Sequence, residues 1–130
     1  MTARHWLRRR PWLYLWLPLV AWMGLIFYLS AQPDLPQPRM GWADLLLSNG
    51  AHAFVFGVLA ILWARALADR PRSWAIAFVL TMLYALSDEV HQAFVPGRHP
   101  DLFDLMFDGI GAMLALGLWA WWLRFERERR

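Results

Sequence analysis

The 130-residue sequence contains no cysteine and no lysine. Without cysteine, the chain has neither a disulfide framework nor a thiolate metal site. All 13 basic residues are therefore arginine. The sequence also lacks a glycine-rich phosphate loop, a Rossmann glycine pattern, a zincin motif and a nucleophile elbow, so no common enzyme class is indicated by its motif.

Long apolar runs dominate the chain, which is 59% hydrophobic and contains 10 tryptophans. A soluble domain of this length could not bury so much apolar surface, whereas a bilayer removes that requirement. Four runs are long enough for helices that cross a hydrocarbon core of roughly 30 Å. We therefore predict an all-α polytopic membrane protein, a single domain over 1–130, with transmembrane helices at about 11–30, 48–65, 73–95 and 102–123.

Local signals indicate where these helices begin and end. The first run is too long and too rich in tryptophan for a cleaved signal peptide, so we expect it to remain as a helix. Asp44 or Ser48 is the expected N-cap of the second helix. Pro96 and Gly97 are expected to form a turn after the third helix.

The distribution of arginine predicts the orientation in the plasma (inner) membrane. With both termini in the cytoplasm, the cytoplasmic segments carry eleven arginines: Arg4, Arg8, Arg9, Arg10, Arg65, Arg70, Arg72, Arg124, Arg127, Arg129 and Arg130. Only Arg39 and Arg98 then lie outside. This is a clear positive-inside bias. Because the arginines gather at helix ends rather than along one face, we expect no nucleic-acid binding.

Ionisable residues on three of the expected helices reach a similar depth. Counted from the cytoplasmic edge, His52, Asp88 and Asp108 lie roughly 20–24 Å into their helices, about two-thirds of the way across. An acid that faced lipid at this depth would cost on the order of 2–3 kcal/mol or more. We therefore expect these side chains to face one another in a polar pocket that opens to the extracytoplasmic side.

Helical spacing supports this convergence. Tyr84, Asp88 and Gln92 share one stripe of the third helix, with Glu89 at its margin, and His91 is expected to face the interface. On the fourth helix, one face carries acids and then small residues: Asp101, Asp104, Asp108, Gly111 and Ala115. The small residues would allow close packing on a neighbouring helix.

The sequence resembles the VanZ-like family. The resemblance is carried by residues 87–98 (SDEVHQAFVPGR), by Asp104 and the run 108–112 (DGIGA), and by residues 27–33 (FYLSAQP) with His52. The chain departs from the family pattern at Asn49, where many relatives carry lysine, and at Asp108 and Asp101, where many carry asparagine and serine or threonine. These changes remove a cation and add acids, which puts in doubt any role that needs a fixed positive charge on the second helix.

The resemblance implies a link to tolerance of teicoplanin-type glycopeptides but no established reaction, so three classes of function stay open. In the first, the pocket acts on or near a lipid-linked or anionic envelope component. Candidate acid/base groups are Asp88, Glu89, His52 and Asp108, and candidate binding groups are Arg98, Gln92, Asp104, Tyr84 and Asn49. In the second, the polar residues form a structural clasp in an assembly protein. In the third, the bundle transports protons or ions, although the apolar cytoplasmic halves of the helices disfavour it.

From the sequence we expect two partners, membrane lipid and a lipid-linked or anionic envelope component, and we expect no cofactor. A divalent cation is an alternative, with Asp88, Glu89, Asp104 and Asp108 as candidate ligands. A cation is considered because so many acids in one pocket need a compensating positive charge, either from a bound cation or from Arg98.

Overall fold

The computed structural model describes residues 11–33 and 42–129 of the chain, and these ranges contain four helices. They are α2 (Pro11–Ser30), α3 (Trp42–Ala66), α4 (Ser73–Gln92) and α5 (Leu102–Glu128). No strand is present in these described ranges. Each helix is long and apolar enough to cross a membrane. The predicted all-α, four-helix membrane architecture is therefore confirmed.

Three helix ends differ from the expected positions. Helix α4 ends at Gln92 rather than at about residue 95. Helix α3 begins at Trp42, so Asp44 and Ser48 lie inside the helix and neither is its N-cap. No proline or glycine interrupts residues 42–49, which leaves the backbone free to continue the helix in the N-terminal direction. The apolar part of α3 is nevertheless Ser48–Ala66. Helix α5 continues to Glu128 because its charged last turns are made of good helix formers.

The turn after α4 follows from its proline and glycine. The amides of Phe94 and Val95 donate to the carbonyls three residues earlier, which tightens the chain as it leaves the helix. Gly97 then adopts a positive φ of 82°, a conformation that glycine tolerates without strain. Asp101 caps α5 by accepting a hydrogen bond from the amide of Phe103 at 2.9 Å.

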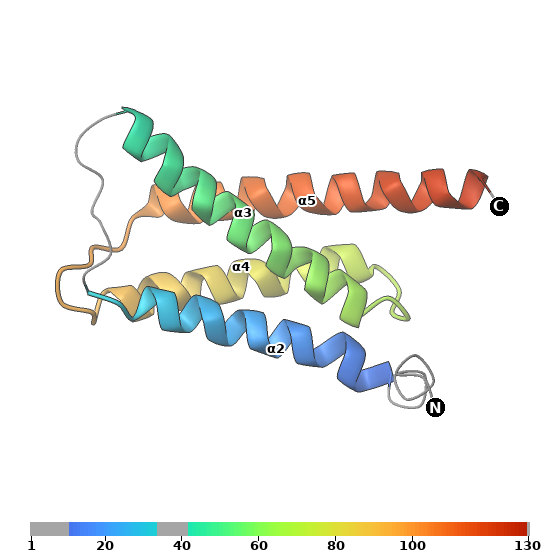
Figure 1. Ribbon diagram of the computed structural model, residues 1–130, viewed down its shortest axis with the longest axis horizontal. Coiled ribbons are helices and arrows are strands. Elements are labelled where there is room, and N and C mark those ends of the chain that lie inside the picture. Colours follow the sequence, from blue (N-terminus) through green and yellow to red (C-terminus); the bar gives the residue numbers. More distant parts are fainter. Residues whose placement is uncertain (1–10, 34–41, 130) are drawn as a thin grey trace, which may run out of the picture.

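The helices form a bundle in which α3 crosses diagonally and contacts the other three (Figure 1). The start of α2, the loop 67–72 and the end of α5 lie at one end of the bundle, here called the 67–72 end (Figure 1). Residues 31–33 and the loop 93–101 lie at the opposite end, here called the 93–101 end. Which end faces the cytoplasm stays a prediction, and Arg4, Arg8, Arg9, Arg10, Arg39 and Arg130 lie outside the described residues.

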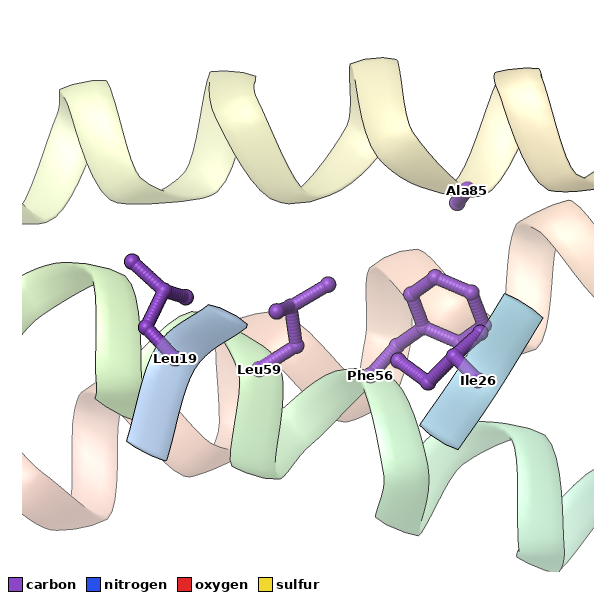
Figure 2. Packing of buried hydrophobic residues seen from close by; sticks show 5 residues of the cluster. All are labelled: Leu19, Ile26, Phe56, Leu59 and Ala85. Atoms are coloured by element: carbon purple, nitrogen blue, oxygen red, sulfur yellow. The ribbon is translucent and has the colours of Figure 1, made fainter. Parts of the chain in front are cut away.

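Apolar side chains hold α2, α3 and α4 together. Leu19 and Ile26 of α2 pack on Phe56 and Leu59 of α3, with Ala85 of α4 completing the cluster (Figure 2). A second cluster is made of small residues and one leucine: Ala60, Ala64, Ala77, Ala112 and Leu116. Small residues let helices approach closely, which is how helices associate in a membrane where hydrophobic burial gives little driving force.

Helices α3 and α5 make the closest approach. A Cβ atom added to Gly111 would overlap the backbone of Ala53, including its carbonyl group. A Cβ atom on Gly57 would lie 3.1 Å from the carbonyl oxygen of Gly111 and 3.2 Å from the Cβ of Ala115. This contact fixes the height at which side chains of α3 meet those of α5. It lies directly beside His52 on α3, and Asp108 and Asp104 lie about one and two turns from it on α5.

The outer surface of the bundle is strongly apolar. Large side chains on all four helices are mostly exposed: Leu17, Val20, Phe54, Trp74, Val79, Leu83, Leu118 and Trp121. Such a surface suits contact with lipid acyl chains rather than water. The polar side chains buried between the helices are therefore the candidates for a functional site.

Candidate functional site

A histidine of α3 meets two acids of α5. The Nδ1 atom of His52 lies 3.1 Å from Oδ1 of Asp108, and its Nε2 atom lies 3.7 Å from Oδ2 of Asp104. Residues four apart lie on the same face of a helix, so α5 presents both carboxylates to the same imidazole ring. The ring stacks on Phe56 one turn further along α3, with ring centroids 6.3 Å apart.

Helix α4 adds a third acid to this group. His52, Glu89 and Asp108 each offer a nitrogen or oxygen ligand atom, and the three atoms lie within 4.8 Å of one another. We call His52, Glu89, Asp104 and Asp108 the polar cluster. Its four side chains come from three helices and meet toward the 93–101 end of the bundle.

The carboxylate of Glu89 also ties the loop to the cluster. Its Oε2 atom accepts a hydrogen bond from the backbone amide of Asp101, the N-cap of α5, at 2.9 Å. Glu89 therefore helps to set where α5 begins, and through the helix it sets where Asp104 and Asp108 project. Sequence reasoning missed this contact because a backbone amide carries no residue-specific signal.

Two oxygens in the cluster are buried and have no hydrogen-bond partner among the residues that the structure describes. They are Oε1 of Glu89 and Oδ2 of Asp108. The two residues are only 7% and 1% exposed. Buried polar atoms in native proteins are nearly always hydrogen-bonded, so each of these oxygens requires an explanation.

Asp88 lies beside the cluster rather than in it. Its Oδ2 atom accepts a hydrogen bond at 3.0 Å from the side-chain amide of Gln92, one turn further along α4. Both side chains are buried. The closest ligand group in the described residues contains Glu89, which the stripe predicted only at its margin, and does not contain Asp88.

Two further predicted residues, Tyr84 and Arg98, join other segments to α2 and its end. The hydroxyl of Tyr84 donates to the carbonyl of Met23 at 2.6 Å and so joins α4 to α2. Arg98 donates from Nε to the carbonyl of Gln32 at 3.2 Å and from Nη2 to that of Leu29 at 3.3 Å. Both contacts are with backbone of the end of α2 and the residues just after it.

Asn49 is buried on α3, one turn before His52. An asparagine side chain is uncharged, so no positive charge from α3 enters the cluster at this position. The cluster faces only one nearby cation on the described chain that is permanently charged, Arg98, which interacts electrostatically with Asp104.

A family model for VanZ/LLP1 matches residues 15–123, which is most of the chain. The protein belongs to the VanZ/LLP1 family. No curated protein and no solved structure gives a match. Within this VanZ/LLP1 domain, the matched range contains all four residues of the polar cluster and the helices that carry them.

Helix α2 of the VanZ/LLP1 domain contributes more to this region than its sequence indicates. Phe27 stacks on His91 of α4, with ring centroids 4.4 Å apart and planes 11° apart. The indole Nε1 of Trp22 donates to the carbonyl of Val55 at 3.0 Å. These contacts join α2 to α4 and to α3, but they involve no acid or base of the polar cluster.

The charge of the polar cluster limits what it can do. Three carboxylates face one imidazole, so the group is acidic overall. Such a group is suited to moving protons between His52 and Asp108 or to holding a cation. It is poorly suited to holding an anion directly, because like charges repel.

Proposed function

We propose that the polar cluster of this multi-pass membrane protein, a VanZ/LLP1-family chain with four apolar helices, is a chemical site at the extracytoplasmic face of the inner membrane. The site would act on an anionic or lipid-linked component of the cell envelope. The observation that carries the proposal is the contact between His52 and Asp108, which pairs a proton carrier with a fully buried acid. Ionisable residues buried in membrane helices are functional candidates by default.

The sidedness of the proposal rests on the arginine distribution. The 67–72 end carries Arg65, Arg70 and Arg72 together with the charged last turns of α5, whereas the 93–101 end carries Arg98. The positive-inside rule then assigns the 93–101 end to the outside. This is where lipid-linked envelope precursors and glycopeptides meet, so the site would lie at the place where the tolerance implied by the family could arise.

A structural clasp is the second candidate, and a specific observation favours it. Polar side chains join separate segments of the bundle at three places. His52 binds Asp108 and Tyr84 binds Met23 between helices, and Arg98 of the 93–101 loop binds Gln32 just after α2. Each of these bonds would stabilise the bundle without any chemistry. Transport is disfavoured because buried apolar residues, among them Leu59, Ala64 and Ala77, fill the interior toward the 67–72 end.

Conservative variants distinguish a site from a clasp. We would express His52→Gln, Asp108→Asn and a control, Asp69→Asn, in a bacterium that is susceptible to teicoplanin-type glycopeptides. Asp69 is an exposed acid of the 67–72 loop. Loss of the tolerance given by the wild-type chain, with unchanged amounts of folded protein, supports the proposal. Unchanged tolerance contradicts it, and loss that follows the amount of folded protein favours the clasp.

A further inference from the structure

The two unpartnered oxygens of the polar cluster point to a missing partner. Oε1 of Glu89 and Oδ2 of Asp108 are buried and have no hydrogen-bond partner within residues 11–33 and 42–129. The residues come from different helices, α4 and α5, yet their ligand atoms converge with that of His52. A buried carboxylate oxygen left unpaired carries a free-energy cost. A ligand that binds both oxygens would remove this cost.

The spacing of these groups fits a metal ion. The three ligand atoms lie within 4.8 Å of one another. Metal–nitrogen and metal–oxygen bonds of about 2.0–2.2 Å hold their ligand atoms roughly 3–4 Å apart. Small side-chain rotations about the same backbone positions would therefore close the site. The hydrogen bond between His52 and Asp108 would exchange for bonds to the ion.

The types of ligand select the class of ion. Calcium and magnesium prefer sites made entirely of oxygen. Imidazole nitrogen combined with carboxylate oxygen suits zinc and its neighbours among the divalent transition metals. Zinc sites that do chemistry use three protein ligands and keep one position open for water or substrate. His52, Glu89 and Asp108 supply such a set, and Asp104 lies 3.7 Å from the other nitrogen of His52.

Charge supplies a further reason for an ion, and this reason rests on the proposed function. The proposed ligand is anionic, but the cluster that would meet it is acidic. A divalent cation held by the carboxylates would neutralise them and present a positive charge to a phosphate or carboxylate group. Arg98 could not do this alone, because two of its nitrogens already bind backbone carbonyls near the end of α2.

We propose that His52, Glu89 and Asp108 bind a divalent transition-metal ion, with Zn²⁺ as the best match, and that this ion connects the acidic site to an anionic group. The claim that the ion meets an anionic group rests on the proposed function, whereas the claim that these residues bind an ion does not. The proposed ligand set differs from the one expected from sequence, because it includes His52 and omits Asp88 and Asp104.

The test uses the full chain purified in detergent and stripped with a chelator. We expect about one Zn²⁺ per chain on adding Zn²⁺ back, measured by mass spectrometry of bound metal, and a melting temperature that rises with Zn²⁺ concentration. Mg²⁺ and Ca²⁺ at the same concentration should produce a much smaller rise. This measurement needs no variant, so it does not depend on whether a substituted chain folds.

Variants then locate the ion. Glu89→Gln and Asp108→Asn should each weaken Zn²⁺ binding by at least about tenfold. The matched control is Asp88→Asn, which alters an equally buried acid of α4 and should bind Zn²⁺ as tightly as the wild type. Loss of binding in Asp88→Asn with retention in Glu89→Gln would overturn the assignment, as would a wild-type chain that binds no Zn²⁺.

The tolerance assay separates this proposal from the proposed function. A chain that binds Zn²⁺ through these residues, but whose variants keep full tolerance, supports the ion and contradicts the chemical site. A chain that binds no Zn²⁺, but loses tolerance in the same variants, overturns the ion and leaves the chemical site standing.

Discussion

Asp108 of α5 places one carboxylate oxygen 3.1 Å from Nδ1 of His52 on α3, while its other oxygen is buried with no hydrogen-bond partner in the described part of the chain. The side chain is only 1% exposed. Half of the carboxylate is therefore used to join two helices and half is not used within the described chain. A residue with only a structural role would be expected to satisfy both oxygens.

The contact between His52 and Asp108 should appear as a coupling energy in a double-mutant cycle. His52→Gln and Asp108→Asn each disturb the same interhelical bond, so their effects on the free energy of unfolding should not add. We expect a coupling of about 1–2 kcal/mol, the upper range for polar contacts between membrane helices. Unfolding in mixed detergent micelles measures it. As a control, Asp108→Asn with the exposed Asp69→Asn should be additive within about 0.5 kcal/mol.

The approach of α3 to α5 predicts a graded effect of glycine-to-alanine substitutions. Gly111→Ala places a methyl group against the backbone of Ala53, so the helices must separate. The cost should be at least about 2 kcal/mol. Gly117→Ala, six residues later on α5, meets nothing within 4 Å and should change stability by less than about 1 kcal/mol. Melting temperatures of the two purified variants test this, and equal effects would contradict the close contact.

The number and type of helices were predictable because length and apolar composition decide them. Their rotation about their own axes was not. Asp88 and Glu89 are adjacent and about 100° apart around α4. A predicted face centred on Asp88 therefore places Glu89 at its margin. Only the packing of α4 on α3 and α5 determines that Glu89 faces His52. Helical spacing alone does not decide which of two adjacent residues faces the neighbouring helices.

Hydrogen bonds that involve backbone atoms could not be predicted from the sequence. The amide of Asp101 binds Glu89, and the carbonyls of Met23 and Gln32 bind Tyr84 and Arg98. Every residue has an amide or a carbonyl, so nothing in a residue's identity marks it as a partner. Tyr84 and Arg98 were identified as important polar residues, but their partners on or near α2 depend on tertiary structure.

Arg98 should act mainly as a link between the 93–101 loop and the end of α2. Arg98→Ala removes two hydrogen bonds to backbone carbonyls and should lower stability by about 1–2 kcal/mol. Arg98→Lys should be intermediate, because an ammonium group lacks the planar fork that reaches both carbonyls. The exposed neighbour His99 supplies the control, His99→Ala. A stable Arg98→Ala protein that loses glycopeptide tolerance would instead identify Arg98 as an anion anchor.

The orientation of the bundle is tested by reporter fusions. Four helices cross the membrane an even number of times, so both ends of the chain should lie on one side. Eleven arginines against two favour the cytoplasm for that side. A fluorescent protein fused after Arg130 should therefore mature, and a phosphatase that needs export should be inactive there. The same phosphatase inserted after His99, in the 93–101 loop, should be active. The reverse pattern would place the polar cluster on the cytoplasmic side and remove its access to extracytoplasmic lipid-linked precursors.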